Sequence, residues 1–339
     1  MEHTAQDGRN IAEFQESDHA NPQAYPVSSP MVATPRTPAR LKADLALLTT
    51  SLIWGSAFVA QRLAALQVGV FLFNGLRFLL AALVLFPFAR WAWRSMPTTA
   101  GSRTEYLVGT AAAGLLLFGG SALQQAGLVF TTASNAGFIT GLYVVFIPIF
   151  MAILWRQRQP PAIWGAAGMA ALGLYLLSTG GEIRFNPGDL LVLASAVFWA
   201  FHVILIGFLV QRLNVLQLAV GQYFVCGLLN ILCGLMFEPW TTSPVAGGWW
   251  AIIYTGIVSV GLGYTLQVVG QRHAPPADAA ILLSMEAVFA ALFGWWLLGE
   301  QLNPVQLLGC GIMLAGMLLS QYPVFFNKTA DRFTLEGKI

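Results

Sequence analysis

Residues 277–320 read ADAAILLSMEAVFAALFGWWLLGEQLNPVQLLGCGIMLAGMLLS, and this stretch decides the fold class. It holds two apolar runs joined by the short polar turn 299–304. A helix rises about 1.5 Å per residue, so about 20 apolar residues span the hydrocarbon core of a bilayer. Within the turn, Asn303 is suited to cap the second helix and Pro304 to occupy its first turn. The stretch therefore predicts two consecutive transmembrane helices.

The same arrangement occurs earlier in the chain, where residues 134–178 read SNAGFITGLYVVFIPIFMAILWRQRQPPAIWGAAGMAALGLYLLS. Shifts of 143 or 145 positions superimpose residues of the two halves: Gly120 on Gly263, Gln124 on Gln267, Asp44 on Asp189 and Trp54 on Trp199. The chain is thus predicted to be a five-helix unit written twice. Because five is odd, the second copy enters the membrane from the opposite side, and such inverted repeats are typical of transporters.

The composition agrees with a membrane protein. The chain is 57% hydrophobic and 9% charged, with a mean hydropathy of +0.67, which places it among polytopic membrane proteins. Basic residues are scattered over loops, so no nucleic-acid partner is expected. Three cysteines lie in apolar runs without metal-ligand spacing, and we interpret them as small buried residues rather than metal ligands.

The predicted fold is an all-α integral membrane protein with ten transmembrane helices, arranged as two inverted five-helix repeats. The spans cover residues 43–66, 69–89, 105–130, 134–155, 161–179, 188–211, 215–237, 248–270, 277–298 and 304–322. With the N-terminus inside, fourteen of the 17 lysines and arginines fall on inner segments, Arg62 and Arg184 fall outside, and Arg77 lies within a span. Basic loops face the cytoplasm. A multi-pass protein of the cell (inner, cytoplasmic) membrane with both termini cytoplasmic is therefore expected.

Four parts of the chain follow from these spans. Residues 1–41 are polar and proline-bearing, without the basic start and apolar core of a signal peptide, and are expected to be a disordered cytoplasmic tail. Residues 42–180 and 187–322 are the two five-helix repeats. Residues 323–339 are expected to be a cytoplasmic C-terminal tail.

Several short motifs resemble the drug/metabolite transporter superfamily in its bacterial EamA-type branch. They are Leu52 to Phe58, Arg77 to Ala81, Asn135-Ala136, Ser284-Met285-Glu286 and Leu298-Gly299-Glu300, and the resemblance covers about residues 42–322. It implies two inverted EamA-like halves around a central cavity, and movement of small organic metabolites by alternating access, often outward. In the family, the glutamate of the ninth span is commonly followed by proline. Here Ala287 follows, which weakens any argument for a broken helix at that point.

Two charged residues lie deep within predicted spans. Arg77 is the basic one and Glu286 the acidic one, and charges at membrane depth normally face a partner or a water-filled cavity. One interpretation is structural: they form an ion pair or bond separately to neighbouring groups. The other is functional: Glu286 faces the cavity and binds a cationic group or a coupling proton, with Arg77 tuning its proton affinity.

Uncharged side chains complete the candidate binding site. Trp54, Phe58 and Gln61 share one face of the first span, and Trp199 and His202 occupy the equivalent helix of the second half. An aromatic face with polar neighbours suits a pocket for amphiphilic solutes, although such faces also serve packing. The repeated Gln124 and Gln267 are candidates for substrate binding or interhelical bonding, and weaker candidates are Asn74, Tyr143, Gln222, Tyr223 and Tyr264.

The remaining acidic residues are predicted to be structural. Asp278 follows two prolines at an expected helix start, so we expect it to be an N-cap, and Asp44 and Asp189 are interpreted in the same way. Glu300 lies at an outer turn.

These features predict a secondary-active transporter, with export favoured, of small organic metabolites or amino-acid-like and drug-like solutes. A proton or a counter-metabolite is a candidate co-substrate, and a homodimer is a candidate assembly. The alternative is a non-transporting membrane receptor or scaffold with a docking tail, which deletion of residues 1–38 would distinguish by its effect on transport. No catalytic set, cofactor motif, metal cluster or phosphate loop is recognised in the sequence, so no enzymatic function and no cofactor are predicted.

Overall fold

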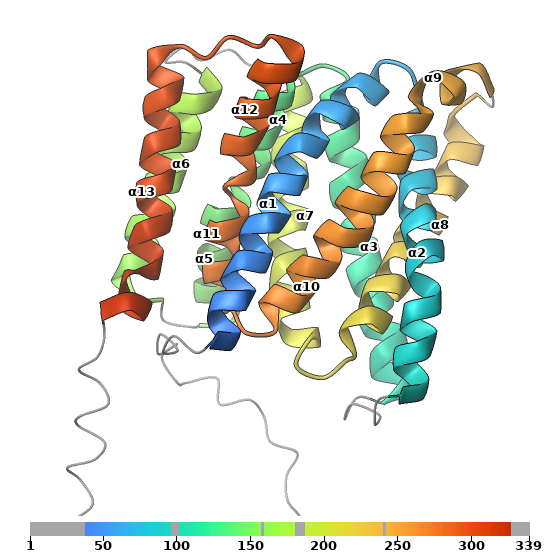
Figure 1. The fold of residues 1–339 in the computed structure, drawn as a ribbon, viewed down its shortest axis with the longest axis horizontal. Coiled ribbons are helices and arrows are strands. Elements are labelled where there is room, and N and C mark those ends of the chain that lie inside the picture. Colours follow the sequence, from blue (N-terminus) through green and yellow to red (C-terminus); the bar gives the residue numbers. More distant parts are fainter. Residues whose placement is uncertain (1–37, 96–101, 157–158, 180–186, 240–241, 327–339) are drawn as a thin grey trace, which may run out of the picture.

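The computed structural model describes residues 38–95, 102–156, 159–179, 187–239 and 242–326. Within these ranges every regular element is a helix (Figure 1). The elements are α1 (Pro38–Ala65), α2 (Val70–Ser95), α3 (Arg103–Leu128), α4 (Ala133–Thr140), α5 (Tyr143–Leu154), α6 (Pro161–Thr179), α7 (Pro187–Leu209), α8 (Val215–Phe237), α9 (Thr242–Ile253), the π-helix η1 (Tyr254–Tyr264), α10 (Thr265–Gln271), α11 (Pro276–Leu283), α12 (Glu286–Leu298) and α13 (Pro304–Phe326).

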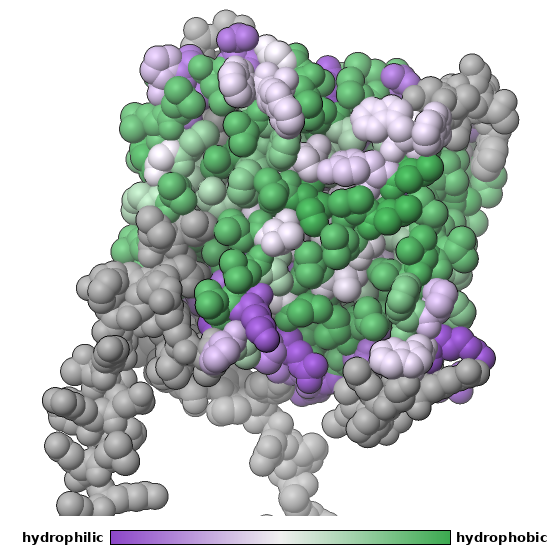
Figure 2. Space-filling view, viewed as in Figure 1, coloured by the Kyte–Doolittle hydropathy of each residue, from purple (hydrophilic) through white to green (hydrophobic). Residues whose placement is uncertain are grey.

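Eight helical segments of the described chain are long and apolar enough to cross a membrane, and a shorter apolar stretch covers Pro304–Gly316 of α13. They are Pro38–Ala65, Val70–Trp91, Arg103–Leu128, Ala133–Leu154, Pro187–Leu209, Val215–Phe237, Gly248–Gln271 and Pro276–Leu298. Figure 2 shows the corresponding apolar surface, with hydrophilic side chains gathered mainly along its lower edge and in places along its upper edge. The prediction of an all-helical, multi-pass membrane protein is confirmed, while the number ten stays a prediction.

Helix packing brings the two parts of the chain into one bundle. The most extensive contacts pair α6 with α13, α2 with α8, α3 with α7 and α8, and α1 with α12. Each of these pairs joins an element before residue 180 to one after residue 186. In Figure 1, α1 begins and α13 ends at the same lower face of the bundle. The two sequence halves therefore build one shared core.

Polar side chains at helix ends fix where several helices begin. Gln306 N donates to Asn303 Oδ1 at 2.9 Å, and Asn303 N donates to Gln306 Oε1 at 2.7 Å. This reciprocal pair confirms the predicted cap at Asn303. Glu238 performs a similar task between helices, since its carboxylate accepts from Phe71 N and Leu72 N of α2, both at 2.8 Å.

The capping role predicted for Asp278 is wrong. Pro275 is the N-cap of α11 and makes no side-chain cap bond. Asp278 Oδ2 instead accepts from Arg40 Nη2 at 2.9 Å, and Arg40 Nε donates to Asp44 at 2.9 Å. Arg40 is 2% exposed, so a buried guanidinium takes both carboxylates because charge pairing outweighs a local cap there. The predicted cap residue therefore ties the first turn of α11 to the start of α1.

Candidate functional site

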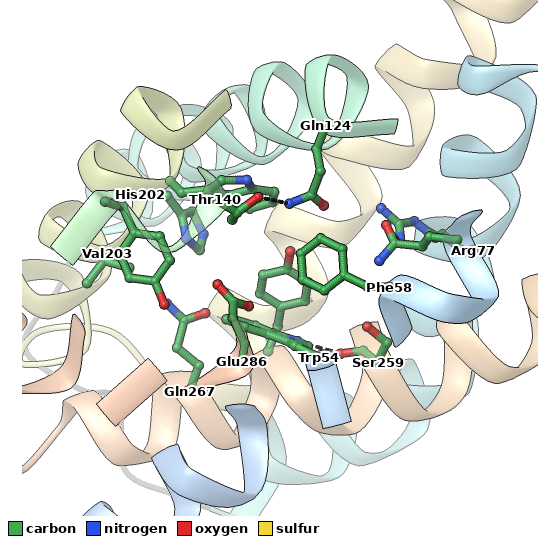
Figure 3. Close-up of a pocket in the computed structure, with 14 residues that line it drawn as sticks. Trp54, Phe58, Arg77, Gln124, Thr140, His202, Val203, Ser259, Gln267 and Glu286 are labelled. Carbon is green, nitrogen blue, oxygen red and sulfur yellow. Dashed lines mark hydrogen bonds between the residues drawn. The ribbon is translucent and has the colours of Figure 1, made fainter. Parts of the chain in front are cut away.

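A small cavity lies within the described bundle, and most of the candidate residues predicted from the sequence line it. Trp54, Phe58, Arg77, Gln124, Tyr143, Trp199, His202, Tyr264, Gln267 and Glu286 all line it, together with Gln61, Thr140, Val203 and Ser259 (Figure 3). About 30 Å³ of this cavity is open to the centres of water-sized molecules, which is room for about two waters. The structure thus shows a small site.

The lining residues come from elements far apart in the sequence. The first part of the chain contributes α1, α2, α3, α4 and α5, and the second part contributes α7, η1, α10 and α12. Thr140, Val203 and Ser259 were not predicted, because they are small or apolar and carry no unusual signal in a membrane span. Their positions follow from which helix faces meet at the cavity.

Two of the helices that reach the cavity are interrupted there. One break separates α4 from α5 at residues 141–142, and the other separates α11 from α12 at residues 284–285. The backbone bonds match: Leu142 N bonds to Ile139 O at 3.1 Å, and Met285 N bonds to Leu282 O at 3.3 Å. Directly after the breaks, Tyr143 begins α5 and Glu286 begins α12. The second break occurs although no proline follows the glutamate.

An aromatic cluster centred on Tyr264 forms one wall of the cavity. Its ring centroid lies 4.5 Å from that of Trp54, 5.9 Å from that of Trp199 and 6.2 Å from that of His202. Trp54 is fixed further by its indole Nε1, which donates to the carbonyl oxygen of Ser259 at 3.2 Å. These contacts place the faces and edges of large rings around a solute-sized space.

Two glycines make room for the tryptophans. A Cβ at Gly263 would lie 2.7 Å from Trp54 Nε1, and a Cβ at Gly120 would lie 2.9 Å from the Trp199 ring. Each indole therefore packs directly on the backbone of a helix from the other part of the chain, α1 on η1 and α7 on α3. Gly120 and Gly263, which the sequence predicts to be equivalent, thus each leave space for a tryptophan ring.

Arg77 and Glu286 line the same cavity, but the ion pair considered from the sequence is not formed among the described residues. Arg77 Nη1 donates to Gln61 Oε1 at 2.8 Å, and its guanidinium lies over the rings of Phe73 and Phe78 at 5.1 and 5.2 Å. A neutral amide and two aromatic faces thus partner the arginine. Glu286 has Tyr143 as a neighbour, and its Oε1 atom has no hydrogen-bond partner.

Several polar atoms of the cavity lining have no partner, although they are shielded from solvent. They include Arg77 Nε, Trp199 Nε1, His202 Nδ1, Gln267 Oε1 and Glu286 Oε1. Unpaired buried polar groups each cost about 1–3 kcal/mol, so they are uncommon without a function or a bound molecule. The other repeated glutamine, Gln124, does have a partner, since its Nε2 donates to Thr140 Oγ1 at 2.9 Å.

Of the weaker sequence candidates, Tyr143 and Tyr264 line the cavity, whereas Asn74, Gln222 and Tyr223 do not. Asn74 donates to the carbonyl oxygen of Ser121 at 3.0 Å, and Tyr223 shares a 3.2 Å hydrogen bond with Thr265. Gln222 contacts the site indirectly, because its Oε1 lies 2.9 Å from His202 Nε2. These residues support the site or the helix packing rather than facing the cavity.

A bundle of membrane-spanning helices around a polar and aromatic cavity is typical of membrane transport proteins. A family model described as "EamA-like transporter family" matches residues 41–179 and again residues 186–322. The chain belongs to the EamA-like transporter family. It is a membrane transporter, and the family and relatives point to transport rather than to catalysis.

Curated relatives carry matching names. An "uncharacterized transporter" of Archaeoglobus fulgidus is 32% identical over 285 residues, covering 83% of this chain and 86% of the relative. The inner membrane transporter YedA of Escherichia coli K12 is 24% identical, covering 81% of this chain and 89% of that protein. A solved crystal structure aligns with a TM-score of 0.68 at 23% identity, over 82% of this chain and 98% of that chain. The last similarity concerns the fold.

Proposed function

We propose that this chain is a secondary-active transporter that moves a small organic metabolite, or an amino-acid-like or drug-like solute, by alternating access. The observation that carries the proposal is the central cavity, which is built by both parts of the chain and contains buried polar atoms without partners. Such atoms would be satisfied by a bound solute or by water. The cavity is too small for a metabolite in this state, so binding requires the walls to move apart.

We further propose ten membrane spans in two inverted repeats, residues 42–180 and 187–322, with α6 and α13 as the fifth and tenth spans. Three matched features support this symmetry. The helix breaks at 141–142 and 284–285 have the same backbone bonds, and Trp54 and Trp199 each pack on an equivalent glycine. Helices of one part pair with helices of the other, as two interlocked repeats would.

Alternating access needs contacts that close one end of the cavity, and Arg40 is suited to this task. It joins the start of α1 to the first turn of α11 through Asp44 and Asp278. Both helices continue toward the cavity, where Trp54 lines it from α1 and Glu286 begins the helix after α11. Breaking these ion pairs would let α1 and α11 separate at this end, as rocking of one repeat against the other requires.

The orientation in the membrane is also a proposal. Described basic residues gather at helix ends on the face where α1 begins: Arg40, Lys42, Arg103, Arg212 and Arg272. Cytoplasmic loops carry the excess of lysine and arginine, so this face is proposed to be cytoplasmic. The relative YedA is named as an inner membrane protein, and we propose the same cell membrane for this chain. Export is the direction that the resemblance favours.

Glu286 is the proposed site of proton coupling. A carboxyl group can take up and release a proton, and this one lies in the cavity at a helix break, with one oxygen unpartnered. Binding of the solute and of the proton at the same carboxyl would link their movements. Uniport and exchange with a second metabolite are the competing modes.

The experiment starts from a thermal-shift screen of the purified full chain against amines, amino acids, sugars and carboxylates. A ligand at 100 times its Kd stabilises the folded state by about 2.7 kcal/mol. A compound that raises Tm is then tested in proteoliposomes with an imposed pH gradient. We expect wild-type vesicles to carry it, Glu286→Gln to lose transport or its pH response, and Glu105→Gln to retain both.

Glu105 is the matched control because the same chemical change is made at the start of α3, outside the cavity lining. A compound that binds in the cavity but is not carried by wild-type vesicles would refute the transport function. Unchanged transport and pH response in Glu286→Gln would refute coupling through this residue.

A further inference from the structure

We propose that one end of the cavity is built to bind a primary ammonium group, held by Glu286 Oε1, Gln267 Oε1 and His202 Nδ1. These three atoms are buried acceptors without partners, and all three residues line the cavity. In Figure 3, Glu286 points toward the side of the cavity where Gln267 and His202 lie. The inference rests on the proposed function and specifies the chemical class of the solute.

The acceptor atom of Gln267 is fixed by a chain of hydrogen bonds behind it. Gln271 Nε2 donates to the carbonyl oxygen of Val203 at 2.8 Å, which leaves Gln271 Oε1 as an acceptor. Gln267 Nε2 donates to that oxygen at 3.0 Å. A carbonyl oxygen can only accept, so this chain of bonds determines both amide orientations. Gln267 Oε1 is thereby turned toward the cavity as an acceptor.

His202 also contacts a glutamine amide, that of Gln222. Its Nε2 lies 2.9 Å from Gln222 Oε1, and with the Gln222 amide in this orientation its oxygen requires a donor opposite it. The proton of a neutral imidazole is then on Nε2, and Nδ1 presents a lone pair. His202 is 0% exposed, so this acceptor can be satisfied only from within the cavity or by a buried water. Gln222 and Gln271 are therefore positioning residues for the two acceptors.

Glu286 supplies the charge that selects a cation. Glu286 is 3% exposed, and among the described residues no basic side chain forms an ion pair with its carboxyl group. Arg77, the other charge of the cavity, is held by Gln61 and lies beyond Phe58 in Figure 3. The anionic and cationic ends of the cavity are thus separate, and an anion at the Glu286 end would be repelled.

A primary ammonium group fits this arrangement better than other cations. It has three N–H donors, which matches the three acceptors, whereas a quaternary ammonium has none and would leave all three unpaired. The faces of Trp54, Trp199 and Tyr264 are available for the cation and for an apolar body. The present space accommodates a group of the size of an ammonium head, and the body of the solute would enter as the walls open.

The test uses ligand binding by the purified full chain in detergent. The probes are 2-phenylethylamine, its N,N,N-trimethyl analogue and 3-phenylpropanoate, which share one ring and differ in the head group. We expect the primary amine to bind at least about tenfold more tightly than either other probe, because unpaired buried acceptors penalise the analogues. Equal or tighter binding of the trimethyl compound or of the carboxylate would overturn the proposal.

Variants of the positioning residue test the role of the acceptors. Gln271→Met removes the bond that orients Gln267 while preserving the approximate side-chain size, and Gln271 does not line the cavity. We expect the preference for the primary over the trimethyl amine to fall about tenfold. The control is Gln211→Met, since Gln211 is exposed and bonds to the carbonyl oxygen of Arg272.

A folding defect would lower binding of both amines equally, so the preference ratio separates it from the proposed role. If Gln271→Met unfolds, Gln222→Met tests the same claim through His202. An unchanged preference in a folded variant of either kind would overturn the assignment of that acceptor.

Phenylalanine distinguishes two sources of the ammonium group. If it binds more tightly than 2-phenylethylamine and Arg77→Gln removes that advantage, the solute is an amino acid whose carboxylate reaches Arg77. If it does not, the solute is a simple amine. These results identify the source of the ammonium group, and the amine preference decides whether the ammonium site exists. A chain that shows the amine preference but carries no amine in proteoliposomes would refute the proposed function and leave this inference standing.

Discussion

Replacing Gly263 by alanine provides a direct test of the cavity wall. The new Cβ would lie 2.7 Å from Trp54 Nε1, 3.2 Å from Trp54 Cδ1 and 3.5 Å from the Ile53 side chain. The indole must therefore retreat by several tenths of an ångström, which lengthens its 3.2 Å bond to the Ser259 carbonyl oxygen. Overpacking costs about 1–3 kcal/mol, and loss of the bond about 1 kcal/mol.

The displaced indole also reduces the space available to the solute. The ring centroids of Trp54 and Tyr264 are already only 4.5 Å apart, and the cavity volume is only about 30 Å³. A shift of the indole is therefore large relative to the site. We expect Gly263→Ala to weaken ligand binding by about tenfold, equivalent to about 1.4 kcal/mol, and to lower Tm.

The matched control is Gly168→Ala, because a Cβ at Gly168 meets no atom within 4 Å. Both substitutions gain the preference of alanine over glycine in helices, about 1 kcal/mol, so the difference between them isolates the steric effect. Isothermal titration with the ligand from the screen measures affinity, and thermal unfolding in detergent measures stability. If Gly263→Ala binds as well as Gly168→Ala, Trp54 does not form a wall of the binding site.

Further predictions concern contacts between the two parts of the chain. Arg40→Gln leaves Asp44 and Asp278 without their shared cation. We expect the free energy of unfolding, measured by thermal unfolding, to fall by up to about 3 kcal/mol. Adding Asp278→Asn to Arg40→Gln is expected to restore part of this loss. Arg212→Gln breaks an ion pair whose two side chains are 50% and 30% exposed, and it is expected to cost less than about 1 kcal/mol; equal losses would refute the bridging role of Arg40. Glu238→Ala removes both bonds to the start of α2 and is expected to lower stability by about 1–2 kcal/mol in the same assay. An unchanged Tm would contradict this role of Glu238.

The membrane class and the approximate positions of most apolar segments were readable in the sequence. Apolar runs, their lengths and the capping signal at Asn303 are local properties, and the predicted span 215–237 coincides with α8. The candidate residues were readable for a related reason. Polar and charged groups are costly at membrane depth, so Arg77 and Glu286 stood out, and both line the cavity.

Contacts between helices were beyond the reach of local patterns. The sequence allowed an ion pair between Arg77 and Glu286, whereas the fold gives Arg77 the amide of Gln61. It suggested a cap at Asp278, whereas the fold brings Arg40 to it across 238 residues. The orientation of Gln267 depends in the same way on a neighbouring element, because Gln271, its partner within α10, is fixed by its bond to the carbonyl oxygen of Val203 in α7.

The physical reason for this division is the range of each interaction. Transfer of a helix into lipid depends on the residues of that helix alone, so hydropathy along the chain determines it. Partner choice among buried polar groups depends on which helix faces meet, and several partners satisfy the same donor. The sequence by itself therefore determined a membrane protein with a few polar groups at depth. Only the tertiary structure decided that those groups surround one cavity and which of their atoms face it.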